Sequence, residues 1–378
     1  MSQTQPPAPE ELEVSVFGPG YGECVLIHVG HGVWLVVDSC IDPRTNRSAP
    51  LGYLESIGFN PASAIDLVVA SHWHADHVRG LHELYTVASA AKFSCASALA
   101  GKEFVSLAKI YSEGAGKIPV GPEELYKCLT TLRHRAKETG KSHHRWAITD
   151  RLLWQSSESS KLKVKLTALS PSDEMFTRMQ QMMLNYVTLL KKGYSEPRLI
   201  AGCPNDVAVA LLLEVNGRQI LLGSDLEQEA NPSVGWSAVL VSEAVKESKC
   251  CMFKVAHHGS ASGHNDQVWD KLLEQEPIAL LTPFRHGKLR IPTQTDRERI
   301  LRRTGRAFIS ADPNASAKLP KKGTKVQALI DSTVHDRRLA AGQMGQVRWR
   351  VPLNNPADLG RVELFDGAMP LALVADAA

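Results

Sequence analysis

The chain of 378 residues is long enough to bury a large core, as one big domain or as two smaller ones. Its composition, 43% hydrophobic and 22% charged, is that of a globular protein, and a net charge of +3 is too small to indicate a partner. The seven cysteines are scattered, and the sequence shows no signal-peptide pattern, which argues against a secreted disulfide-rich protein. It also contains no apolar run near the ~20 residues of a membrane span, which argues against a membrane protein. We therefore expect a cytoplasmic protein with no membrane attachment, and composition identifies no protein partner.

Strands and helices are predicted in an order typical of a mixed fold. Residues 1–12 are polar and Pro-rich, and they are predicted to be disordered. Strands are predicted from short apolar or alternating runs, at residues 24–29, 33–37, 65–70, 152–155, 162–169, 207–215, 219–223, 251–256 and 278–281. Helices are predicted over 51–57 and 174–192, and after Thr295, which forms a capping-box pattern with Glu298. This order fits an α+β sandwich in which helices lie outside two sheets.

One catalytic domain is expected over residues 13–325. Between about residues 78 and 150 the pattern turns helical and irregular, which predicts an insertion beside the core. Residues 326–378 contain short strands, and we expect them to form a β-rich extension packed on the same domain.

A cluster of ionisable side chains, His72-Trp-His74-Ala-Asp76-His77, directly follows the predicted buried strand 65–70. Side chains alternate along an extended chain, so His72, His74 and Asp76 point to one side, and His77 can turn toward them from the start of a helix. Imidazole and carboxylate ligands suit Zn, Mn or Fe. A catalytic metal needs about three protein ligands and one open position. Four ligand-type residues at this spacing therefore indicate two metals.

Further candidate ligands follow two later strands. Asp225 comes after a predicted hairpin with an Asn216-Gly217 turn, and His257 and His258 come after strand 251–256. Neighbouring residues on a strand face opposite ways, so one histidine is expected to bind metal. The other is expected to contact the substrate or to give a proton to the leaving group. Both assignments stay open, with His257 preferred as the ligand and His258 as the catalytic group.

Together these motifs resemble those of the metallo-β-lactamase superfamily, and more closely its branch of ComEC/Rec2 nuclease-like domains. The resemblance spans roughly residues 13–310. It rests on the Gly-rich segment from Gly18 to Glu23, the strand-end Asp38, the histidine cluster, Asp225 and the run His257-His258-Gly-Ser. It implies a four-layer αββα sandwich with a helical insertion. Glu23 replaces an aspartate of the branch, and the superfamily's third histidine for the first metal has no clear equivalent between His77 and Asp225.

The resemblance also implies a role for each residue. One metal would be held by His72 and His74, the second by Asp76 and His77, and Asp225 would bridge both. Asp38 would orient a ligand from behind. The predicted metal ligands are His72, His74, Asp76, His77, Asp225 and His257, and the predicted catalytic groups are Asp76, His258 and Asp38.

Two divalent metals, with Zn or Mn expected, can share a hydroxide and stabilise charge on a substrate oxygen when they lie about 4 Å apart. This chemistry serves phosphodiesters, lactams, thioesters and lactones alike. The resemblance to the ComEC/Rec2 branch implies a phosphodiester. The tract 285–325, which holds twelve Lys/Arg against three Asp/Glu, favours the same class, so a nucleic acid or nucleotide is the expected substrate. The predicted substrate contacts are Ser260, Arg285, His286 and Lys288. Three alternatives stay open: a small non-nucleotide substrate, a non-catalytic binding module, and a merely solvated basic tract.

Overall fold

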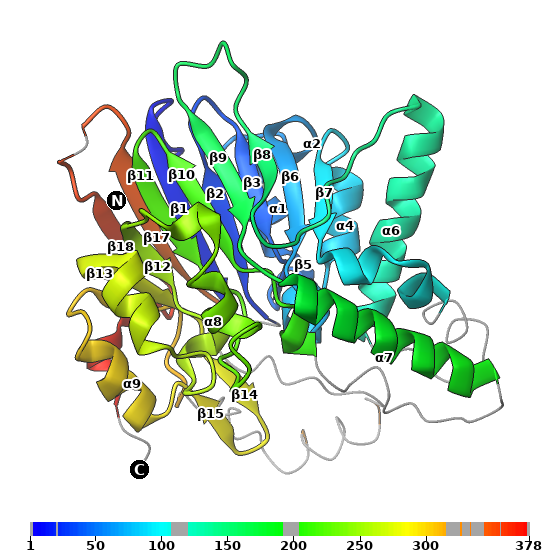
Figure 1. Cartoon of the computed structure of the whole chain (residues 1–378). Helices are drawn as coiled ribbons and strands as arrows, with labels where there is room; N and C mark the ends of the chain where they lie inside the picture. Colours follow the sequence, from blue (N-terminus) through cyan, green and yellow to red (C-terminus); the bar gives the residue numbers. More distant parts are fainter. Residues whose placement is uncertain are drawn as a thin grey trace.

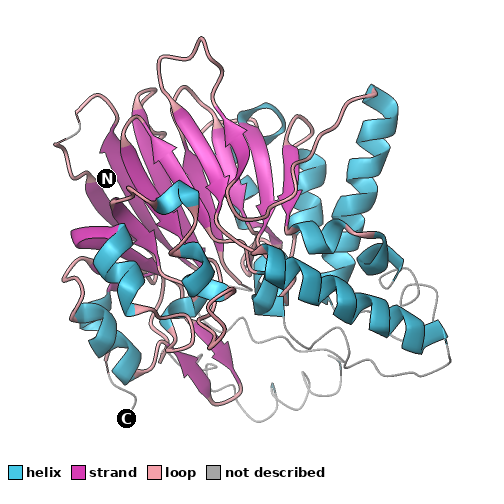
Figure 2. Ribbon diagram, in the orientation of Figure 1, coloured by secondary structure: helices cyan, strands magenta, loops and turns pink. Residues whose placement is uncertain are grey.

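Two β-sheets pack face to face in the computed structural model, and helices cover their outer faces (Figure 1, Figure 2). The structure describes residues 3–19, 22–106, 120–191, 204–314, 326, 333, 344–355 and 357–375. The architecture is the four-layer α+β sandwich of the metallo-β-lactamase fold, as the sequence predicted.

The first sheet combines strands from both ends of the chain. Its order is β18 (Arg361–Phe365), β17 (Gly345–Pro352), β1 (Glu11–Gly18), β2 (Cys24–His28), β3 (Trp34–Val37), β6 (Ile65–Ala70) and β7 (Lys92–Cys95). The strands β3, β6 and β7 are parallel. Parallel strands are buried on both faces, which is why β6 is apolar along nearly its whole length.

The second sheet runs in the order β19 (Met369–Pro370), β16 (Ala307–Ile309), β13 (Leu273–Leu281), β12 (Cys250–Lys254), β11 (Arg218–Leu222), β10 (Leu211–Val215), β9 (Val164–Ala168) and β8 (Arg151–Gln155). The predicted hairpin is present as β10 and β11, and Asn216 and Gly217 adopt the positive φ angles of 48° and 87° that its tight turn requires. Two small hairpins lie outside the sheets, β4 (Ile41–Asp42) with β5 (Arg47–Ser48), and β14 (Phe284–His286) with β15 (Leu289–Ile291).

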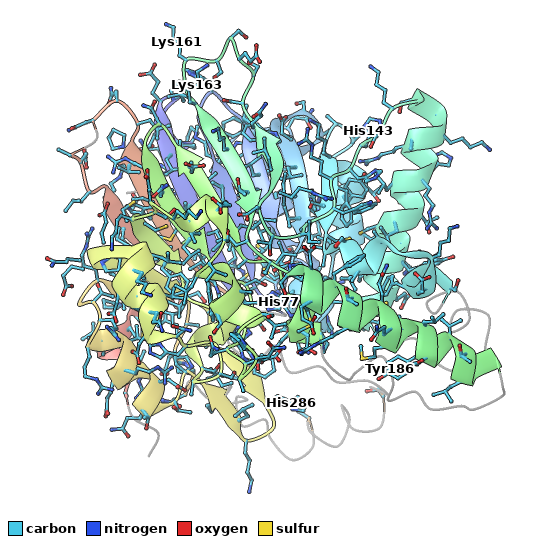
Figure 3. The ribbon with its side chains drawn as sticks, viewed as in Figure 1. His77, His143, Lys161, Lys163, Tyr186 and His286 are labelled. Atoms are coloured by element: carbon cyan, nitrogen blue, oxygen red, sulfur yellow. The ribbon has the colours of Figure 1, made fainter. Side chains whose placement is uncertain are left out.

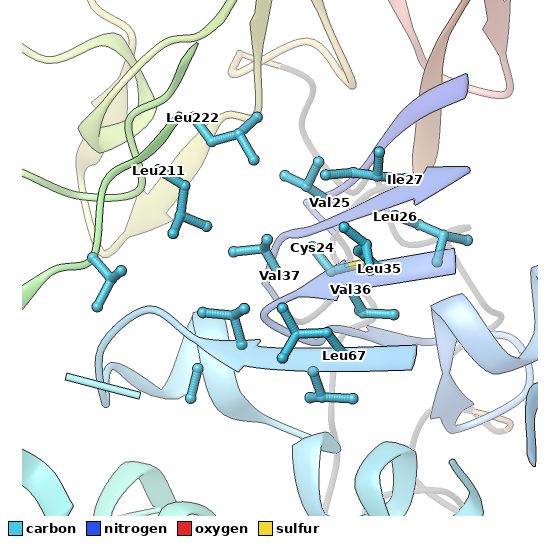
Figure 4. Packing of buried hydrophobic residues seen from close by; sticks show 14 of the residues in the cluster. Cys24, Val25, Leu26, Ile27, Leu35, Val36, Val37, Leu67, Leu211 and Leu222 are labelled. Carbon is cyan, nitrogen blue, oxygen red and sulfur yellow. The ribbon is translucent and has the colours of Figure 1, made fainter. Parts of the chain in front are cut away.

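Apolar side chains fill the space between the sheets. Leu211 and Leu222 of the second sheet face Val25 and Val37 of the first, and all belong to one buried cluster (Figure 4). A separate cluster covers the outer face of the second sheet, where the helices α8 (Gly235–Val239) and α9 (Gln294–Leu301) pack. The remaining named α-helices are α1 (Ala49–Ser56), α2 (Pro61–Ala64), α3 (Ala75–Val78), α4 (Leu81–Val87), α6 (Val120–Thr139) and α7 (Asp173–Lys191).

Three features differ from the sequence predictions. The helical stretch predicted at 78–150 also contains a strand, because β7 pairs with β6 there. The capping box of α9 is formed by Thr293 and Asp296, two positions before the predicted pair. The N-terminal segment predicted to be disordered is tied to the fold, because β1 begins at Glu11 and the carbonyls of Gln3 and Gln5 accept hydrogen bonds from Arg348 and Arg350.

The C-terminal strands belong to both sheets. The strand β17 pairs with β1 along eight residues, and β19 pairs with β16.

None of the described helices is both long enough and apolar enough to span a membrane.

Candidate metal centre

The predicted ligands meet at one edge of the sandwich because of the strand directions. The strands β3 and β6 run parallel, as do β11 and β12, so the residues that follow them leave at the same edge of their sheets. Asp38 follows β3, the histidine cluster follows β6, Asp225 follows β11, and the pair His257-His258 follows β12. Residues up to 220 positions apart in the chain therefore line one buried space.

Close backbone approaches at two glycines hold this edge together. A Cβ atom on Gly22 would lie 1.8 Å from the carbonyl oxygen of Asp76, and the next residue, Glu23, donates its backbone N–H to that oxygen at 2.8 Å. A Cβ atom on Gly223 would lie 2.9 Å from Ala256. The glycines let the segment before β2 reach the histidine cluster, and they let the ends of β11 and β12 lie side by side.

Two histidines of the first-sheet cluster lie close to Asp225, and the other two ligand candidates lie close to these histidines. The Nε2 atom of His72 lies 3.0 Å from Nδ1 of His74 and 3.8 Å from a carboxylate oxygen of Asp225. The Nε2 atom of His77 lies 3.4 Å from Asp225 and 3.8 Å from the Asp76 carboxylate. Figure 3 shows His77 beneath the strands in the lower half of the molecule.

The second sheet contributes His258. Its Nε2 atom lies 3.4 Å from Asp76 and 3.6 Å from Asp225, and the side chain is only 4% exposed. Both His257 and His258 have positive φ angles, 46° and 54°, which residues other than glycine rarely adopt. This backbone turn directs two adjacent histidines to different surroundings, with His258 facing the buried acids.

Three buried atoms at the heart of the cluster make no hydrogen bond among the described residues. They are Nε2 of His77, Oδ1 of Asp225 and Nε2 of His258. Burying a nitrogen or a carboxylate oxygen without a partner is unfavourable by several kcal/mol, and a bound ligand removes this cost. Imidazole nitrogens and carboxylate oxygens are the donors that Zn and Mn prefer. His72, His77 and Asp225 also place one donor atom each within 4.8 Å of one another. The residues present therefore fit a divalent metal ion.

The charges of the cluster also fit a divalent metal ion. Burial would lower the pKa of His258, but Asp225, Asp76 and Glu23 raise it to about 10. Burial would likewise raise the pKa of Asp225, yet His77 and His258 hold it well below its usual value. The buried carboxylates thus require positive charge beside them. Divalent cations would supply that charge.

Asp38 supports two of the histidines from behind. Its carboxylate accepts the backbone N–H of Ser71 at 2.7 Å and the Ser71 hydroxyl at 2.6 Å, and it lies 2.8 Å from Nδ1 of His77. Because the Ser71 hydroxyl donates to Asp38, its oxygen can accept the Nδ1–H of His72, which lies 3.0 Å away. Both histidines are thereby held in the tautomer that presents Nε2 to the centre.

A second supporting group stands behind His258, and the sequence reasoning did not place it. Glu23 is 2% exposed, lies 3.3 Å from Nδ1 of His258 and pairs with the buried Lys254 at 2.9 Å. The Thr282 hydroxyl donates to the same carboxylate and lies 3.2 Å from His258 Nδ1. The available signal was Lys254 itself, since a lysine within an apolar strand requires a buried partner.

Glu23, His77 and His258 also come close enough to surround one cation. The nitrogen that His77 turns toward Glu23 is Nδ1, 4.0 Å away, and this atom already pairs with Asp38. The Glu23 carboxylate already forms an ion pair with Lys254. Glu23 therefore supports the ligands, because it lies beside the Nδ1 atoms of His77 and His258, whereas the Nε2 atoms of these rings are the unsatisfied ones.

His257 lies outside the buried cluster. Its Nδ1 atom is 2.8 Å from the Ser262 hydroxyl and 3.0 Å from Glu227, and its Nε2 atom is 3.3 Å from the side-chain amide of Asn205. The side chain is 21% exposed. Its position at the rim gives it access to a bound molecule.

The predicted substrate-binding residues lie in two places. Ser260 bonds to Ser262 at the rim. The other three belong to the hairpin β14–β15, which begins beside the centre because the Phe284 ring stacks on His258 with 5.2 Å between ring centroids. Within this hairpin Arg285 turns back to donate to the Asp312 carbonyl. His286 and Lys288 are exposed, and Figure 3 shows His286 below His77.

Comparison with known proteins supports the superfamily. Residues 17–126, which include the histidine cluster, match the model of the metallo-beta-lactamase superfamily. No curated protein sequence matches the chain.

Several solved structures are similar to part of the chain. YhfI from Bacillus subtilis, a metallo-beta-lactamase fold protein, is 15% identical with a TM-score of 0.30 over 65% of this chain and 70% of its own. MEM-A1, a subclass B3 metallo-beta-lactamase from a soil metagenome library, is 15% identical with a TM-score of 0.34 over 68% and 83%. The short form of human tRNase Z is 11% identical with a TM-score of 0.31 over 64% and 76%. Similarity at this level carries no statement about substrate.

Proposed function

We propose that this protein is a hydrolase that uses two divalent metal ions, and that its substrate is a phosphodiester. The observation that supports the metals best is the set of three unsatisfied buried atoms on His77, Asp225 and His258, which face one another across the ends of both sheets. Zn or Mn suits these donors.

The geometry favours one assignment of the ligands. His72 and His74 turn their nitrogens toward each other and would hold the first ion, and Asp76 and His77 would hold the second. Asp225 lies within 3.8 Å of both His72 and His77, so its carboxylate would contribute a ligand to both positions. For the last ligand we propose His258 in place of His257, because only His258 faces the acidic residues of the centre.

The chain's own residues would then divide the work of hydrolysis. When bound, the metals supply an activated water and stabilise negative charge on the substrate. Asp76 and Asp225 would hold the metals through their carboxylates, and Asp38 keeps the histidine rings in place. His257 lies at the rim, 3.0 Å from Glu227, and is the histidine that would contact the leaving group of the substrate.

The hairpin β14–β15 favours a phosphodiester as the substrate. Phe284 fixes its first strand against His258, and Lys288 stands exposed at its turn. A cation beside two metals suits an anionic substrate that approaches from solvent. The ComEC-like resemblance in the sequence supports the same substrate class, and it makes a nucleic acid the first candidate.

Metal analysis combined with a nuclease assay tests the proposal. The wild-type protein is loaded with Mn²⁺ or Zn²⁺ and compared with His74→Ala and Asp225→Ala, using circular dichroism to confirm that both variants fold. We expect the wild type to bind about two ions per chain and to cut a phosphodiester, and we expect each variant to lose at least about 1000-fold in rate. Protein that carries no metal, or variants as active as wild type, would overturn the proposal. Hydrolysis of lactones, thioesters or lactams without phosphodiester cleavage would overturn the substrate class alone.

A further inference from the structure

A shallow depression of about 550 Å³ lies on the surface where the edges of the two sheets meet. It is lined by His144, Arg145, Trp146, Asp150, Arg151 and Leu152, and we call it the edge pocket. The segment around His144 bridges to β7 of the first sheet, while Arg151 begins β8 of the second. None of the centre's ligands lines it. Figure 3 places His143, the neighbour of His144, toward the opposite end of the molecule from His286.

Two guanidinium groups are held over the edge pocket. Arg145 donates to the carbonyl of Leu152 at 3.0 Å, and Arg151 donates to the carbonyl of Trp146 at 3.5 Å. Each bond fixes its arginine to the far side of the loop, and the remaining N–H donors of both side chains are available to a ligand because both residues are exposed. Among the described residues, neither arginine has a carboxylate within ion-pair distance. These donors suit phosphate oxygens.

The nearby acids do not neutralise this surface. Residues 133–151 contain six Lys/Arg against two Asp/Glu. Glu138 pairs with His134 at 3.2 Å. Asp150 turns to the helical turn at Glu243–Val245, where its carboxylate accepts the backbone N–H groups of Glu243 and Ala244 at 3.1 and 2.9 Å. With two arginines and one aspartate in its lining, the edge pocket carries a net positive charge.

An aromatic surface lies beside these cations. The rings of His144 and Trp146 lie 4.2 Å apart between centroids at 31°, and both residues are only partly buried. Any nucleobase can stack on such a surface without regard to sequence, while arginines bind the neighbouring phosphates. Tilted aromatic rings in the same pocket as two guanidinium groups favour a nucleic acid over a protein partner or a membrane.

We propose that the edge pocket binds single-stranded nucleic acid at a distance from the metal centre. This inference rests on the proposed function, and it specifies a polymer as the substrate. A strand long enough to reach both places would gain affinity from the edge pocket, whereas a mononucleotide would not.

Binding of a labelled oligothymidylate of about 20 nucleotides to the full chain, measured by fluorescence anisotropy in chelator at low salt, tests this. The variant Arg145→Gln/Arg151→Gln is compared with Lys249→Gln/Lys271→Gln, which removes two exposed cations elsewhere. We expect the first variant to bind about tenfold more weakly and its log–log salt slope to fall by about 1.4, and the control to stay within about twofold of wild type. Equal binding by the two variants would overturn the proposal.

Stacking is tested separately, with the wild-type protein and with one variant. Wild-type protein is titrated with an abasic oligonucleotide of the same length, and Trp146→Leu is titrated with the oligothymidylate. We expect both to bind about fivefold more weakly or worse. If the abasic strand binds as tightly as the oligothymidylate, the pocket binds phosphate alone and the proposal fails. Binding here needs no hydrolysis, so protein that binds but does not cut sinks only the proposed function, and protein that cuts but binds elsewhere sinks only this inference.

Discussion

The two sides of the metal centre are built in different ways. On the side of the first sheet, His72, His74, Asp76 and His77 come from one short loop, and one carboxylate, Asp38, holds two of the histidines. On the side of the second sheet, Asp225 and His258 come from different strands, and the support for His258 reaches it from the first sheet through Glu23.

This difference determines whether a substitution on each side affects metal binding alone or folding as well. The first side depends on local geometry, because a loop of six residues fixes the spacing of its ligands. The second side depends on the packing of the two sheets, since the Glu23–Lys254 ion pair joins the start of β2 to the end of β12. We therefore expect variants of the second side to disturb both the fold and the metal, and variants of the first side to disturb the metal alone.

The largest expected effect separates the two adjacent histidines. His258→Ala removes a nitrogen that faces Asp76 and Asp225, so we expect loss of one bound metal and a fall in hydrolysis of at least about 1000-fold. The matched variant His257→Ala should keep both metals, since its ring pairs with Glu227 and Asn205 outside the centre. Metal content by mass spectrometry decides between them. Full metal content in His258→Ala would show that the ligands are assigned to the wrong histidine.

The sequence was more informative about the first side for the same reason. The loop His72–His77 is a local pattern, and so are the turn Asn216-Gly217 and the strand that became β6. The choice between His257 and His258 is not local, because two successive left-handed residues replace the strand alternation on which the prediction depended. The role of Glu23 depends on a lysine 231 positions away, and β7 lies in a stretch without strand alternation.

Loss of folding stability should be clearest for variants of the second side. Lys254 is 1% exposed, and Lys254→Met removes the lysine that pairs with the buried Glu23 carboxylate, which keeps only its contacts with His258 and Thr282. We expect the free energy of unfolding of the metal-free protein to fall by about 3–5 kcal/mol, measured by urea denaturation in chelator. The double variant Glu23→Gln/Lys254→Met should recover most of this loss, because no buried charge then lacks a partner. A single variant within about 1 kcal/mol of wild type would contradict the view that this ion pair joins the sheets.

The smallest of these effects compares the two supporting carboxylates directly. Asp38→Asn disturbs His72 and His77 together, and these histidines are assigned to different metals, so we expect the affinity for both ions to fall by about 10–100-fold. Glu23→Gln disturbs His258 alone, so it should weaken only the second ion by a similar factor. Competition with a coloured chelator measures the two affinities separately. Equal weakening of both ions in Glu23→Gln would mean that the two positions are coupled through Asp225, and the centre would then respond as one unit to damage on either side.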